Sequence, residues 1–85
     1  MIKGITKSGF RFRVDENKLD WSVMELLSEI EENPLKMVQL AKKILGNVQY
    51  DELKKHCKTK RGNIPIDRIE KELTEILNTK STLKN

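Results

Sequence analysis

The segment HCKTKRGNIP, residues 56–65, contains the residues of this chain whose types and spacing come closest to a chemical site. A zinc site needs about four ligands, most of them Cys or His, and this chain has one residue of each type. Adjacent helical positions point about 100° apart, so His56 and Cys57 are poorly placed to share a metal or to act as a nucleophile and its base. We therefore expect no metal, no cofactor and no enzymatic activity.

The basic residues of the same segment raise the possibility of a phosphate-binding loop. Neither the glycine spacing nor the preceding buried strand of such a loop is present around Gly62. Cations at a helix C-terminus are explained by the helix macrodipole, which favours them by about 0.3–1 kcal/mol. Gly62, Asn63 and Pro65 are turn-forming residues. The segment is thus expected to be a helix end, a turn and the start of another helix.

Length and charge limit the classes of protein to consider. A chain of 85 residues with 36% hydrophobic residues supports one small core. The net charge of +4 suggests an acidic partner, but 13 acidic residues are interspersed with the basic ones, which favours a solvated surface over a nucleic-acid footprint. We predict a cytoplasmic protein, because the cysteine is alone and MIKGITK lacks a signal-peptide core. We predict no membrane span, because the apolar runs are far shorter than about 20 residues.

The N-terminal residues predict a β-hairpin over residues 2–14. Phe10, Phe12 and Val14 alternate with Arg11 and Arg13, which is the period of a half-buried strand. Gly4 is expected to weaken the first strand. Because a hairpin alone is unstable, its aromatic face must pack on helices.

The rest of the chain carries apolar residues at helical spacing. Asp20 and Asn33 are positioned as N-caps, Gly46 as a C-terminal stop, and Cys57 falls on an apolar stripe as a small buried side chain. Ile66, Ile69, Leu73, Ile76 and Leu77 share the last predicted face. We predict a mainly α fold with a short N-terminal β-hairpin (α+β) and about four short helices around one core. The helices are expected at 20–32, 34–45, 48–58 and 65–77. We expect a single domain over residues 1–78 and a mobile polar tail over 79–85.

One interpretation of the central helices is a DNA-binding regulator of a phage or prophage. QLAKKILGNVQYDELKKH resembles a helix-turn-helix, with Ala41 on the first helix and Gly46 in the turn. The separation is five positions where the usual pattern has four, and Asp51 and Glu52 would face phosphates. Strongly salt-dependent DNA binding would favour this alternative.

Two longer segments, ITKSGFRFRVDENKLDWSVMELLSEIE and LAKKILGNVQYDELKKHCKTKRGNIPIDRIEKELTEIL, together resemble the small tail assembly chaperones of long-tailed bacteriophages and prophages of Gram-positive bacteria. Ile66 departs from the Ser or Thr that relatives often carry, and the basic balance departs from their acidic bias. The resemblance covers residues 5–78 and is carried by Thr6, Lys7, Ser8, Gly9, Phe10, Phe12, Val14, Asp15, Glu16, Trp21, Leu45, Gly46, His56, Gly62, Ile64 and Pro65.

The resemblance implies a binding protein without enzymatic activity. Such chaperones bind the tape measure protein, keep it soluble and help to recruit tail tube subunits; they act in the host cytoplasm and are absent from the mature virion. Self-association and a longer frameshift product of the same gene, with slippage near Leu83-Lys84-Asn85, are further expectations. A single Trp in a small domain is usually a core residue, but Trp and Met also suit protein-binding grooves; the predicted partner-binding residues are Trp21, Met24, Leu27, Met37 and Leu40.

Overall fold

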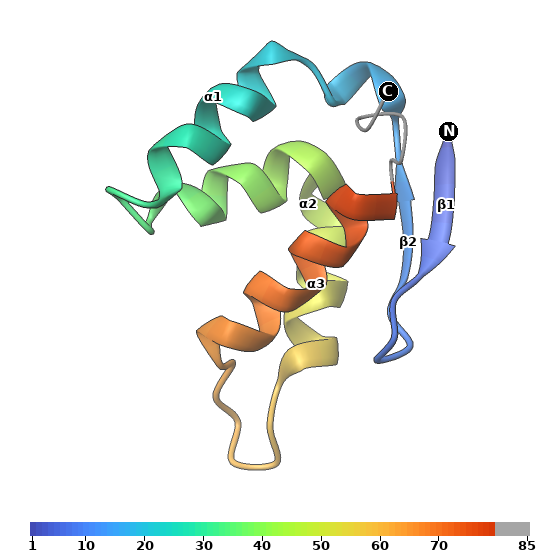
Figure 1. Ribbon diagram of the computed structural model, residues 1–85. Coiled ribbons are helices and arrows are strands. Elements are labelled where there is room, and N and C mark those ends of the chain that lie inside the picture. Colours follow the sequence, from blue (N-terminus) through green and yellow to red (C-terminus); the bar gives the residue numbers. More distant parts are fainter. Residues whose placement is uncertain (80–85) are drawn as a thin grey trace.

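A computed structural model describes residues 1–79 as a β-hairpin beside a set of helices (Figure 1). The predicted tail, apart from Thr79, and the predicted slippage position lie outside the described residues. The hairpin and the helical majority confirm the predicted fold class. The elements are β1 (Ile2–Ile5), β2 (Arg11–Val14), a 3₁₀ turn η1 (Glu16–Lys18), α1 (Trp21–Ile30), α2 (Lys36–Cys57) and α3 (Ile66–Thr79).

The two strands pair antiparallel, with Ile2 opposite Val14 and Gly4 opposite Phe12. Phe12 and Val14 are buried and the arginines of β2 are exposed, as the alternation predicts. The ring of Phe12 lies against Gly4 so closely that a Cβ atom built on Gly4 would be 2.6 Å from the ring carbon Cζ. Gly4 therefore makes room for the aromatic side chain that attaches the hairpin to the core.

The prediction of four helices is wrong in number, because the described residues contain three. The predicted helices 34–45 and 48–58 are the two arms of α2, which changes direction at Gly46 (Figure 1). Gly46 has φ 76° and ψ 168°, a conformation that is essentially restricted to glycine. One glycine is thus enough to turn the chain, and no separate loop divides the arms.

Buried side chains come from both β2 and the helices. Phe12, Leu40, Ile44 and Leu53 are at most 2% exposed, and Cys57 is buried as expected. Ile66 was placed on the apolar face of the last helix, but its side chain is 76% exposed. It stands in the first turn of α3, where it borders a surface hollow. In the part of the chain that the structure describes, no helix has the length and apolar character of a membrane span.

Candidate partner-binding surface

The start of α1 forms the first of three apolar hollows. Asp20 begins this helix by accepting a hydrogen bond from the Ser22 backbone N–H at 2.9 Å, as an N-cap does. The Ser22 hydroxyl also donates to this carboxylate and lowers its pKa below the ordinary value of 3.8. The first hollow is lined by Leu19, Asp20, Trp21, Val23, Met24, Leu27 and Leu77. Trp21 is 73% exposed and Met24 47% exposed, so both are available to a partner.

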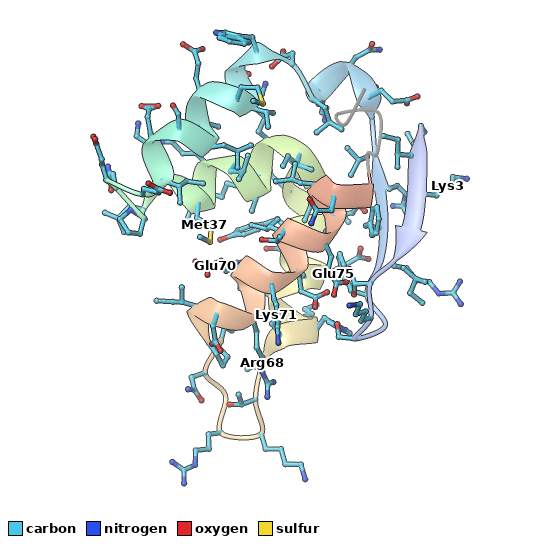
Figure 2. All side chains as sticks on the ribbon, viewed as in Figure 1. Lys3, Met37, Arg68, Glu70, Lys71 and Glu75 are labelled. Carbon is cyan, nitrogen blue, oxygen red and sulfur yellow. The ribbon has the colours of Figure 1, made fainter. Side chains whose placement is uncertain are left out.

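A second hollow lies where α1, α2 and α3 meet. Leu27 and Leu77 line it together with the first hollow, so the two adjoin. Figure 2 shows Met37 of α2 close to Glu70 of α3 at this place. Besides these four residues, the lining includes Ile30, Leu40, Leu73 and Thr74.

The third hollow is the largest of the three and has a volume of about 350 Å³. Met37 lines it as well as the second hollow. Leu35 and Ile66 at its margin are 78% and 76% exposed. Its other lining residues are Pro34, Val38, Ala41, Tyr50, Lys54, Ile64 and Ile69.

The three hollows form one apolar track, because neighbouring hollows share Leu27, Leu77 and Met37. All five predicted partner-binding residues line this track. Leu40 is only 2% exposed and belongs mainly to the core, so it has little surface left for a partner. That these residues bind a partner stays a prediction.

Sequence reasoning missed the third hollow. Ile66 was expected to be buried on the face of the last helix, while Leu35, directly after Pro34, and Ile64, directly before Pro65, belonged to no predicted apolar stripe. The available signal was the presence of three large aliphatic residues next to two prolines, at turns and helix starts where polar residues are usual. The hollow forms only because the turn before α2 and the turn before α3 come together.

A polar cluster ties the hairpin turn to the helices. Glu72 of α3 is 6% exposed and accepts hydrogen bonds from the Thr6 hydroxyl at 2.6 Å and from the Ser8 hydroxyl at 2.7 Å. The Ser8 Oγ also lies 2.9 Å from His56 Nε2, and the Lys7 backbone N–H donates to Glu75 Oε2 at 2.9 Å. We call Thr6, Ser8, His56 and Glu72 the polar latch.

The polar latch is a Ser, His and carboxylate arrangement, but its hydrogen bonds run differently from those of a nucleophilic triad. The single hydroxyl proton of Ser8 is directed to Glu72, so the contact between Ser8 Oγ and His56 Nε2 is a hydrogen bond in the tautomer that carries a proton on Nε2. A nucleophilic serine instead needs an imidazole that accepts its proton and a carboxylate that orients that imidazole. The geometry therefore describes an attachment of the turn to α2 and α3. Among residues 1–79, no group of three or more His, Cys, Asp and Glu side chains is arranged to hold a metal ion.

The structure also places the residues of the helix-turn-helix interpretation. Gln49, in the first turn after Gly46, is buried and exchanges two hydrogen bonds with the backbone of β2: its Oε1 accepts from the Arg13 N–H at 2.7 Å and its Nε2 donates to the Arg13 carbonyl at 2.6 Å. In a recognition helix the residues of this turn reach base edges. Here that turn is packed on the hairpin.

Comparisons of the chain with models of protein families, with curated proteins and with solved structures give no match. The resemblance to tail assembly chaperones therefore stays a prediction.

Proposed function

We propose that this protein is a tail assembly chaperone that binds the tape measure protein of a long-tailed phage or prophage along the apolar track. In this role it keeps the tape measure protein soluble in the host cytoplasm, helps to recruit tail tube subunits around it, and leaves before the virion is complete. The observation that carries the proposal is the continuity of the track across three helices. The sequence resemblance names the partner.

The exposed apolar residues are those expected of a binding site. Large aliphatic and aromatic side chains in contact with water lose favourable burial of about 25 cal/mol per Å², and contiguous apolar patches on small proteins often mark binding surfaces. Trp21 at one end and Leu35 and Ile66 at the other are each more than 70% exposed. A partner that covers them recovers this energy.

The shape of the track fits a helical partner. An amphipathic helix presents apolar side chains at i, i+3, i+4 and i+7, which enter successive hollows of a groove. The track offers three adjoining hollows in series. Its margin carries charged groups of both signs: Asp20 at the first hollow, Glu70 at the second and Lys54 at the third. An apolar centre with a polar margin is the usual anatomy of a protein interface.

The test is co-expression of the tagged protein with the tape measure protein from the same phage genome. The soluble fraction of the tape measure protein and its recovery with the tag after a high-salt wash are measured. Trp21→Ala and Ile66→Ser each remove a side chain that is more than 70% exposed, so the fold should persist. Each should weaken binding about tenfold or more, as truncation of an interface hot spot does. Val48→Ser is the matched control, because Val48 is 70% exposed and does not line the track.

Recovery of the tape measure protein that depends on Trp21 and Ile66 but not on Val48 supports the proposal. If Trp21→Ala and Ile66→Ser both leave the fold and the binding unchanged, the track is not the site. If the tape measure protein is not recovered at all, and DNA is retained at low salt and released at high salt, the regulator alternative replaces the proposal.

A further inference from the structure

The outer edge of β1 is an open sheet edge. In an antiparallel pair, alternate residues direct their backbone N–H and C=O groups away from the partner strand. The Thr6 N–H donates to the Phe10 carbonyl at 2.9 Å, which continues the register of Gly4 opposite Phe12. The intervening residues, Lys3 and Ile5, therefore present their backbone groups outward. Figure 1 shows β2 between β1 and the helices, with β1 outermost.

The opposite edge of the hairpin is closed at Arg13. Arg13, which pairs with Lys3, directs its N–H and C=O groups to the side chain of Gln49. The amide of Gln49 thus takes the place that a third strand would occupy beside β2. Outside the ladder with β2, the backbone of Lys3 and Ile5 makes no hydrogen bond within residues 1–79. Within residues 1–79, the β2 edge is thus occupied at Arg13, whereas the β1 edge is open to another strand.

The outward face of the same hairpin is basic. Lys3 lies directly opposite Arg13, and Ile5 opposite Arg11. Like charges that face each other across two strands destabilise the pair, and none of the three basic side chains forms a salt bridge with a carboxylate within the described residues. Figure 2 shows Lys3 directed away from the helices. A shallow hollow on the hairpin is bordered by Lys3, Gly4, Ile5, Arg11, Phe12 and Arg13.

We propose that β1 is a second binding site, which adds an extended acidic segment of a partner protein as a third strand. The backbone of Lys3 and Ile5 supplies the ladder hydrogen bonds, as in other cases of strand addition. Carboxylates on alternate residues of the added strand lie beside Lys3 on the neighbouring strand. Arg11 and Arg13 stand one strand further away, about 10 Å between backbones, and their long side chains extend over the same face toward these carboxylates, which relieves the repulsion among the three cations. The proposal stands on the hairpin and does not depend on the partner of the apolar track.

Charge also decides between the possible occupants. A second copy of the chain, paired edge to edge through β1, would bring two sets of Lys3, Arg11 and Arg13 together on one small sheet, and like charges at that distance repel. A nucleic acid would use the positive charge but has no use for the outward N–H and C=O groups of an open edge. An acidic peptide satisfies both features.

The experiment is an NMR titration of the ¹⁵N-labelled full chain at low salt. The probe is a capped peptide of about eight residues, a usual strand length, in which glutamate alternates with threonine. Saturable binding is expected, with hydrogen exchange of the Lys3 and Ile5 amides slowed about tenfold or more in the complex. The same peptide with N-methyl groups on alternate amides, and a version with lysine in place of glutamate, should not bind.

Two pairs of variants separate charge from backbone pairing. Lys3→Glu and Arg13→Glu should weaken peptide binding about tenfold or more by reversing charge at the site, whereas Lys60→Glu, at an exposed position in the α2–α3 turn, should leave it within about twofold. Ile5→Pro removes one outward N–H without taking a bond from the ladder with β2, since proline is tolerated at such edge positions. It should abolish binding, and Ile5→Ala should retain it. The amide spectrum of each variant reports whether the hairpin persists.

Four results overturn the proposal. One is the absence of binding by the acidic peptide. Another is binding that leaves exchange at Lys3 and Ile5 unchanged or that survives Ile5→Pro with the hairpin intact. Tighter binding of a single-stranded oligonucleotide, with the same dependence on Lys3 and Arg13, would assign the surface to phosphates. Self-association of the free protein with protected Lys3 and Ile5 amides would make a second copy the occupant.

Discussion

The substitution Gly4→Ala distinguishes best between the sequence pattern and the structure, because the two predict opposite changes in the free energy of unfolding. Glycine in a strand costs about 0.5–1 kcal/mol relative to alanine, so the pattern predicts that alanine stabilises the hairpin. In the structure a Cβ at Gly4 would lie 2.6 Å from Phe12 Cζ and 3.0 Å from Cε2, and the Phe12 ring is only 2% exposed. Overpacking of this kind costs about 1–3 kcal/mol. The net expectation is a loss of up to about 2.5 kcal/mol in the free energy of unfolding, with a central value of about 1 kcal/mol.

Urea denaturation followed by circular dichroism at 222 nm measures this loss. In thermal denaturation, a domain of this size should show a Tm lower by about 4–8 °C for each 1 kcal/mol lost. The control is a double-mutant cycle with Phe12→Leu, which shortens the side chain that the new methyl group meets. Gly4→Ala should cost little in the Phe12→Leu background, since the contact is gone. Equal or greater stability of Gly4→Ala in the otherwise unchanged protein would refute the reasoning.

Three further predictions concern the polar latch, the start of α1 and the cysteine. Glu72→Ala removes the acceptor of two hydroxyl hydrogen bonds from a buried site and should lower the free energy of unfolding by about 2–4 kcal/mol. The control Glu70→Ala, at an exposed position of the same helix, should change it by less than about 0.5 kcal/mol. Equal urea midpoints for the two variants would contradict the role of the polar latch. The hydrogen bond from the Ser22 hydroxyl lowers the pKa of Asp20 below 3.8, so the ionised carboxylate stabilises the fold above that value and this stabilisation disappears as the pH falls through the folded-state pKa. The difference in urea midpoint between the unchanged protein and Asp20→Asn should therefore be constant near neutral pH and shrink below about pH 4; a difference that does not vary with pH would count against it. Burial, followed by the nearby charge of Glu72, raises the pKa of the Cys57 thiol above 9.0, so Cys57 should react slowly with a disulfide reagent at neutral pH and quickly in denaturing urea; equal rates in both conditions would show that the thiol is accessible.

The hairpin and the start of α1 could be predicted because each depends on local chemistry. Strict alternation from Phe10 to Val14 has one structural explanation, and an N-cap such as Asp20 acts on the amides of the next turn. The prediction of Asn33 as the next N-cap was wrong, because α2 begins at Lys36 with Leu35 at its N-cap and without a side-chain cap hydrogen bond. The number of helices could not be predicted in the same way. Gly46 marks a change of direction in the sequence, but whether one residue or a loop makes the turn depends on how both arms of α2 pack on the rest of the molecule.

The candidate site was predictable only in part. Trp21, Met24 and Leu27 share one stripe of α1, so a surface containing all three follows from periodicity alone. The exposure of Trp21 does not, because it depends on whether another element covers the stripe. The third hollow combines Leu35 and Ile66, which are more than 30 positions apart in the sequence, and no local pattern predicts that two turns will meet.

The polar latch changes what the resemblance to tail assembly chaperones can mean. Three of the residues that carry the resemblance belong to the latch: Thr6 and Ser8 donate to Glu72, and Ser8 also contacts His56, which fixes the hairpin turn to α2 and α3. Phe10 adds to this attachment, with its ring centroid 5.5 Å from that of His56. These residues therefore specify how the hairpin docks, and proteins that share them would share this fold before they share a partner. Under the two proposals, partner choice is left to the residues of the apolar track and of the β1 edge, most of which do not belong to the shared pattern. It follows that Thr6→Val and His56→Ala should act on partner binding only through stability, whereas Ile66→Ser and Lys3→Glu should act on binding at unchanged stability.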